Sequence, residues 1–123
     1  MTLPLILCID DDPISIKLLK SFLCEQFRIS TALSAQDGLE LIKNERPDLI
    51  ISDVLMPDMN GFEIISKLRE SPETAKIPFI FISSLAQLSN IGTSERSGIP
   101  QFFTKPIDHD HLLDSIKRLL SKD

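Results

Sequence analysis

The 123-residue sequence lacks the features that mark several large functional classes. It contains no Gly-x-x-x-x-Gly-Lys-Ser/Thr loop, which excludes a P-loop nucleotide site. The net charge is −5, so neither non-specific binding to nucleic acid nor attraction to an anionic membrane surface is expected. The apolar run at residues 3–9 is far too short to span a membrane, and it leads directly into three acids, which is unlike a signal peptide.

Cysteine and histidine are both scarce. Cys8 and Cys24 lack Cys-x-x-Cys spacing and lie in apolar surroundings, which predicts reduced core thiols rather than a disulfide or a metal pair. Reduced thiols in turn favour a cytoplasmic location. His109 and His111 are two residues apart on an expected helix, where side chains diverge, so we interpret them as surface residues rather than metal ligands.

The length and composition indicate one globular domain, residues 1–123, with 42% hydrophobic and 25% charged residues. Short apolar runs bounded by turn formers predict strands at residues 5–9, 27–31, 48–53, 78–82 and 101–104. Helical spacing between them predicts helices at 13–26, 35–45, 62–69, 85–98 and from 109 onward, the fourth short or irregular. This alternation predicts an α/β fold: a doubly wound five-stranded parallel sheet of order 2-1-3-4-5 with five helices.

The first expected helix carries clear start signals. Asp12 suits the N-cap and Pro13 suits the first helical position. Four apolar residues then recur at helical spacing and predict its buried face: Leu18, Leu19, Phe22 and Leu23.

Residues able to bind or react lie at the carboxyl ends of four expected strands, which share one edge of a parallel sheet: Asp10 with Asp11, Asp53, Ser83 and Lys105. Three neighbouring carboxylates repel one another, and an oxygen-only ligand set with room for water suits Mg²⁺, with Mn²⁺ as a second possibility. Lys105 supplies a fixed positive charge and Ser83 a hydroxyl, so the group held among them is best explained as phosphoryl. Each residue alone could be a cap, a turn residue or a solvated charge. The combination favours a carboxylate, Asp53, that accepts a phosphoryl group.

Over its whole length the chain resembles the response regulator receiver domains of two-component signalling. The resemblance is carried by the Asp10-Asp11 pair, Asp53 followed by Met56-Pro57 and Asn60-Gly61, Ser83, and Lys105-Pro106. It implies that Asp53 is the phosphoacceptor and that Asp11 ligates Mg²⁺ directly. It also implies that Asp10 acts through water and that the backbone carbonyl of Leu55 completes the protein ligands.

The resemblance also implies a switch and its partners. Phe102 falls at the position of the family's switch aromatic, so Ser83 and Phe102 are expected to relay phosphorylation to a surface of helix four, strand five and helix five. The bond between Lys105 and Pro106 is expected to be cis. A sensor histidine kinase or histidine phosphotransfer protein would donate the phosphoryl group, and a downstream protein or output domain would read it. We expect a monomer or a phosphorylation-induced dimer, without direct contact with nucleic acid or membrane, acting alone or within a longer chain.

Some positions depart from the usual family pattern. The family commonly has Thr in place of Ser83 and Ala in place of Ser84, its helix four is usually rich in alanine, and Pro100 precedes the last strand. Two other functions remain to be weighed. An aspartyl-phosphate phosphohydrolase needs an acid two residues after its nucleophile, where this chain has Leu55. A degenerate receiver that only binds proteins would lack one of the acids, and this chain has all of them.

Two apolar residues bear on how long a phosphoryl group would persist. In the family, the positions of Leu55 and Leu85 flank the path of the hydrolytic water. Because neither side chain can hydrogen-bond, we expect them to shield the phosphoryl group and leave that water unoriented. The alternative is that both leucines face solvent or a partner surface.

Overall fold

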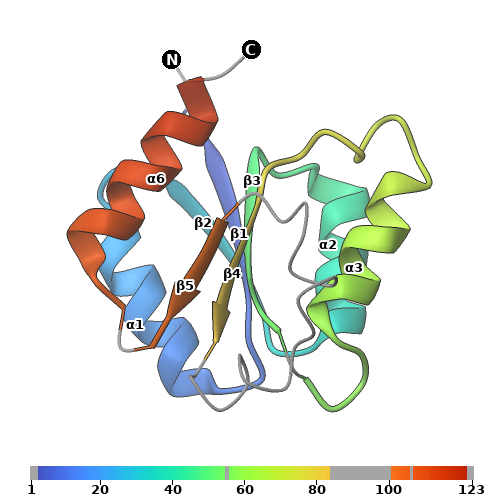
Figure 1. Cartoon of the computed structure of the whole chain (residues 1–123), viewed down its shortest axis with the longest axis horizontal. Helices are drawn as coiled ribbons and strands as arrows, with labels where there is room; N and C mark the ends of the chain where they lie inside the picture. The colour runs from blue at the N-terminus through green and yellow to red at the C-terminus, as the bar shows by residue number, and fades with distance from the viewer. Residues whose placement is uncertain (1–2, 55, 84–100, 106, 122–123) are drawn as a thin grey trace.

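A computed structural model describes residues 3–54, 56–83, 101–105 and 107–121 (Figure 1). Within these ranges the chain forms five strands and four helices. The predicted fourth helix at 85–98 lies outside the described residues. The first helix ends sooner than predicted, at Leu23, with Cys24 as its C-cap.

The strands form one parallel sheet of order β2-β1-β3-β4-β5, which confirms the predicted topology. They are β1 (Leu5–Ile9), β2 (Arg28–Ala32), β3 (Leu49–Asp53), β4 (Phe79–Ser83) and β5 (Gln101–Thr104). Ser52 pairs in register with Ile9 of β1 and with Phe81 of β4, so the carboxyl ends of these three strands lie level with one another.

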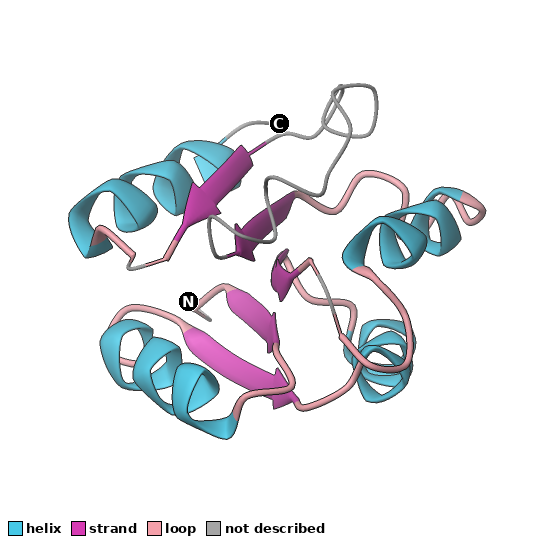
Figure 2. Cartoon of the chain, turned by 60° about the horizontal axis from the view of Figure 1, so that its bottom comes forward, coloured by secondary structure: helices cyan, strands magenta, loops and turns pink. Residues whose placement is uncertain are grey.

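Helices cover both faces of the sheet. The described helices are α1 (Pro13–Leu23), α2 (Ala35–Glu45), α3 (Gly61–Arg69) and α6 (His109–Ser121). Figure 1 shows α1 and α6 on one side of the strands and α2 and α3 on the other, and Figure 2 shows the same two layers from the edge where the strands end. In Figure 1 the start of β1 and the end of α6 lie together at the opposite edge.

The two helical layers enclose two separate apolar cores. Along β1, Ile6 and Cys8 pack in the core beneath α1 and α6, whereas Leu7 and Ile9 pack in the core beneath α2 and α3. This alternation follows from the two-residue period of a strand, and burial on both faces explains the continuous apolar run. Each fully buried side chain of this kind contributes about 1.5–3 kcal/mol relative to leaving it exposed.

Two predictions about buried residues are wrong. Leu18 is 64% exposed, because the buried stripe of α1 consists of Ile16, Leu19 and Leu23. Leu18 lies about 100° around the helix from Leu19 and projects outward. Cys24 is exposed at the helix end, whereas Cys8 is buried as predicted.

Candidate functional site

The carboxyl ends of the strands bring three aspartates together. Asp10 and Asp11 follow β1 directly, and Asp53 is the last residue of β3. Each offers a carboxylate oxygen, and these oxygens all lie within 4.8 Å of one another. We name Asp10, Asp11, Asp53 and Lys105 the acid pocket.

Local hydrogen bonds orient the two buried carboxylates. Asp53 is only 5% exposed, and its Oδ1 accepts the N–H of Val54 at 2.8 Å. Asp10 is equally buried, and its Oδ1 accepts the N–H of Asp12 at 3.0 Å. Asp12 in turn caps α1 by accepting the N–H of Ile14, as its sequence position predicts. The start of α1 therefore helps to hold Asp10 in place.

Lys105 is the cation that faces these acids. Its Nζ lies 3.3 Å from Oδ2 of Asp10 and 3.9 Å from Oδ2 of Asp53. Among the residues that the structure describes, one ammonium group thus accompanies three carboxylates, and the pocket holds excess negative charge. A bound cation would relieve this imbalance.

The excess charge is reflected in the acidity of Asp53. Burial raises the pKa of this carboxyl from 3.8 to about 6, and the neighbouring charge of Asp10 adds to the effect. Attraction to Lys105 and the hydrogen bond from the N–H of Val54 lower the pKa but only partly offset the rise. The interactions that stabilise the negative charge of Asp53 are therefore weaker than those that oppose it.

This donor set fits a hard divalent cation. All three groups are carboxylates, and Asp11 is exposed while Asp10 and Asp53 are buried, so solvent water can complete the coordination. The Leu55 carbonyl, predicted as a further ligand, lies outside the described residues.

The remaining predicted site residues are placed only by their backbones. Ser83 is the last residue of β4 and pairs with Thr104 of β5. Phe102 of β5 pairs with Phe81 of β4. The side chains of Ser83 and Phe102, and Pro106, lie outside the described part of the structure. Their roles as hydroxyl donor, switch aromatic and cis proline stay predictions.

The two histidines diverge, as predicted, and both are exposed. The His109 ring stacks on Phe22 with 4.3 Å between ring centroids. The His111 ring meets Phe103 edge-on at 5.0 Å. Each imidazole therefore packs against a different aromatic ring on the α1 side of the sheet.

A hollow of about 180 Å³ opens beside the acid pocket, between α1 and the chain that follows β5. Asp10 and Lys105 line one end, and Leu18, Leu19 and Ile107 supply apolar walls. Ile14, which is 69% exposed, lies one helical turn before Leu18 on α1. The acid pocket thus adjoins an exposed apolar stretch of α1.

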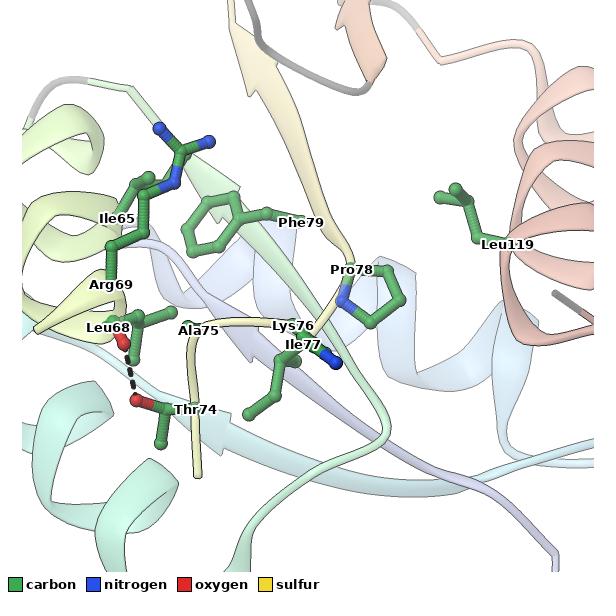
Figure 3. A pocket seen from close by; sticks show the side chains of 10 residues that line it. All are labelled: Ile65, Leu68, Arg69, Thr74, Ala75, Lys76, Ile77, Pro78, Phe79 and Leu119. Atoms are coloured by element: carbon green, nitrogen blue, oxygen red, sulfur yellow. Dashed lines mark hydrogen bonds between the residues drawn. The ribbon is translucent and has the colours of Figure 1, made fainter. Parts of the chain in front are cut away.

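A second hollow, of about 350 Å³, lies at the opposite end of β4 (Figure 3). Ile65, Leu68 and Phe79 line it, and Thr74 donates its hydroxyl to the Leu68 carbonyl at 2.6 Å. The same carbonyl, near the end of α3, also accepts the N–H of Ser71 at 3.3 Å. Because Pro78 and Phe79 lie where β4 begins, this hollow is remote from the acid pocket.

Sequence reasoning missed one residue near the site. Asp58, in the loop after β3, accepts the N–H of Ala35 at 3.2 Å and the N–H of Gln36 at 2.9 Å. Nothing local in the sequence signals these bonds, because they join residues far apart in the chain. The capping box between Asn60 and Glu63 was also not predicted, although Asn followed three residues later by Glu is a recognisable signal.

Among the described residues, none of the helices is long and apolar enough to cross a membrane.

Comparison with known proteins gives a consistent result. The chain is 37% identical over 114 residues to the uncharacterized 14.6 kDa protein in the sodA1 3′ region of Leptolyngbya boryana, covering 92% of this chain and 87% of that protein. It is 35% identical over 115 residues to Response regulator PleD of Caulobacter vibrioides, covering 93% of this chain but only 25% of PleD. Chemotaxis response regulator CheY4 of Vibrio cholerae superposes with a TM-score of 0.83 at 25% identity, covering 96% of this chain and 99% of that one. The model of the response regulator receiver domain matches residues 6–117, and with this fold and acid pocket the chain belongs to that family.

Proposed function

We propose that this receiver domain takes a phosphoryl group onto Asp53 from a sensor histidine kinase or a histidine phosphotransfer protein, with Mg²⁺ as cofactor. One observation carries the proposal: the buried Asp53 offers a carboxylate oxygen within 4.8 Å of those of Asp10 and Asp11, and its Oδ2 lies 3.9 Å from the Lys105 ammonium. Three acids at one sheet edge repel one another, and a bound cation would offset that repulsion.

The transfer is a displacement at phosphorus. A carboxylate oxygen of Asp53 attacks the phosphorus of a phosphohistidine, the P–N bond breaks, and the imidazole nitrogen keeps the electron pair and gains a proton. Asp53 must be ionised to attack, and a pKa of about 6 leaves it largely ionised at neutral pH. Bound Mg²⁺ would supply the positive charge that three carboxylates and an incoming phosphoryl group require.

The surroundings of the two adjacent aspartates suit different roles. Asp10 is buried and already engaged by Lys105 and by the N–H of Asp12, which suits contact with the cation through water. Asp11 is exposed, which suits a direct ligand. The Leu55 carbonyl would complete the protein ligands, and Mn²⁺ would serve in place of Mg²⁺.

Lys105 would neutralise negative charge beside Asp53 and Asp10. Its ammonium contacts both Asp10 and Asp53 and is about one-third exposed, so it can reach an oxygen of a phosphoryl group on Asp53. A point charge on a flexible stem suits this role.

Ser83 and Phe102 would then convert phosphorylation into a change of surface. Capture of a phosphoryl oxygen by the Ser83 hydroxyl would favour a second packing of the chain around β5. This is a population shift between two states. The affected surface, formed by helix four, β5 and α6, would bind a downstream protein or output domain.

The donor protein would dock beside the acid pocket. Exposed Ile14 and Leu18 on α1 provide an apolar contact next to Asp10 and Lys105. Apolar contact of this kind is typical of protein interfaces. We place this reaction in the cytoplasm, in a monomer or in a dimer formed on phosphorylation, without direct binding to nucleic acid.

Incubation with acetyl phosphate and Mg²⁺ tests the proposal directly. Intact-mass analysis should show one added phosphoryl group on the wild type, none with EDTA, and none on Asp53→Ala. Asp110→Ala removes an exposed acid of α6 and should be labelled like the wild type. Labelling that survives in Asp53→Ala would refute the assignment of Asp53.

A further inference from the structure

Asp58 connects the loop after β3 to the start of helix α2, which lies more than 20 residues earlier in the sequence. Both of its carboxylate oxygens accept backbone N–H groups from the first turn of α2, those of Ala35 and Gln36. These donors have no partner within the helix, and a negative charge is favoured at a helix N-terminus. The N–H of Gln36 is the main cause of a lowered Asp58 pKa, so the bonds hold the ionised form.

Asp58 belongs to the loop that leaves the acid pocket. This loop starts at Val54, whose N–H bonds to Asp53, and it closes where the N–H of Gly61 bonds to the Val54 carbonyl at 2.7 Å. The capping box of α3 fixes the end of the loop at Asn60. Between those ends, Met56 and Met59 pack in the core beneath α2 and α3, and Asp58 adds the loop's described hydrogen bonds to α2.

An exposed aspartate could be a solvated surface charge, but geometry argues otherwise here. A solvated carboxylate would not place both oxygens against two successive amides of a distant helix. Two charge-assisted bonds restrict the loop far more than one neutral bond would. Because a loop held in its bound conformation has less entropy to lose, ligand binding beside it is strengthened.

We propose that Asp58 is a positioning residue, which clamps the loop to α2 and holds the Val54 N–H and the Asp53 carboxylate in the arrangement that binds the cation. This inference rests on the proposed function of the acid pocket. Asp58 touches neither the cation nor the phosphoryl group, and it acts through the backbone of the loop.

The test compares Asp58→Ala with two matched controls. Ser34→Ala removes another cap of α2, the bond from the N–H of Asp37 to the Ser34 hydroxyl, without touching the loop. Asp37→Asn removes an exposed charge from the same helix turn. Asp58→Asn, which is isosteric and keeps one acceptor oxygen, provides a second variant if Asp58→Ala folds poorly.

Two readouts are measured for each variant. Amide hydrogen exchange at Gly61, in protein freed of metal by EDTA, reports whether the loop stays closed. Titration with Mg²⁺ by calorimetry reports affinity. Asp58→Ala should speed exchange at Gly61 and weaken Mg²⁺ binding about threefold to tenfold, less than the loss of roughly 10- to 100-fold seen when a group bonded directly to a ligand is removed. Asp58→Asn should fall between the wild type and Asp58→Ala.

The controls decide what the result means. Ser34→Ala and Asp37→Asn should leave exchange at Gly61 and Mg²⁺ affinity close to those of the wild type. If Asp58→Ala matches these controls in both readouts, the clamp is overturned while the function of the acid pocket stands. If the wild type binds no Mg²⁺, the proposed function falls, and exchange at Gly61 still decides whether Asp58 holds the loop.

Discussion

Replacing Asp53 by asparagine should stabilise the metal-free protein at neutral and alkaline pH, although it removes the residue at the centre of the acid pocket. Burial and the charge of Asp10 raise the pKa of Asp53 from 3.8 to about 6. The folded state therefore binds this proton more tightly than the unfolded state does. Ionisation destabilises the fold progressively as pH rises from 3.8 to 6, and the full cost is present above pH 6.

The size of the effect follows from the shift. A rise of about two units corresponds to about 3 kcal/mol, which Asp53→Asn should recover at pH 8 because asparagine carries no charge. At pH 4.5 wild-type Asp53 is mostly protonated in the folded protein, so the advantage of the variant should fall to about 1 kcal/mol. Asparagine keeps an oxygen that can accept the N–H of Val54, so little else is lost.

Urea unfolding followed by circular dichroism measures this difference, since the chain has no tryptophan or tyrosine to report by fluorescence. Both proteins are compared in EDTA at pH 8 and at pH 4.5, with Glu40→Gln, an exposed acid in the middle of α2, as a control that should change neither value. Added Mg²⁺ should stabilise the wild type, by about 2.7 kcal/mol at a concentration a hundred times the Kd, and close the gap at pH 8. A variant no more stable than the wild type at pH 8 would refute the charge imbalance inferred for the pocket.

Three further predictions concern the switch, the phosphoryl lifetime and the packing of α3. Ser83→Ala should still take up a phosphoryl group but lose the NMR shift changes in β5, and an unchanged spectral response would refute the coupling. Leu55→Asn combined with Leu85→Glu should speed loss of the phosphoryl group about tenfold on Phos-tag gels, whereas equal or slower decay would show that these leucines do not control water access. Gly61→Ala should cost about 1–3 kcal/mol in urea unfolding, because a Cβ there would lie 2.2 Å from the ring of Phe81; an unchanged midpoint would contradict this contact.

The fold could be predicted because each local signal agrees with the global topology. The Asp12-Pro13 pair marks the start of α1, and the continuous apolar residues of β1 are buried on both faces. Strand ends in a parallel sheet share one edge, so the meeting of Asp10, Asp11 and Asp53 followed from topology alone.

Other features depend on information that local pattern does not contain. Leu18 has the spacing of a core residue, but whether the apolar stripe of α1 is centred on Leu18 or on Ile16 depends on how the helix is rotated against the sheet. The bonds of Asp58 to the first turn of α2 join a loop and a helix that only the folded sheet brings together. Such contacts need the tertiary structure, because sequence periodicity describes one element at a time.

The start of β1 and the end of α6 lie at the edge of the sheet opposite the acid pocket (Figure 1). A tag, a surface linker or a fused reporter attached at either end would therefore leave the pocket open to a donor protein. In this geometry, the acid pocket and the attachment point of any module joined at those ends are separated by the length of a five-residue strand, about 17 Å. A chemical event at Asp53 could then reach such a module through a change of packing along the sheet.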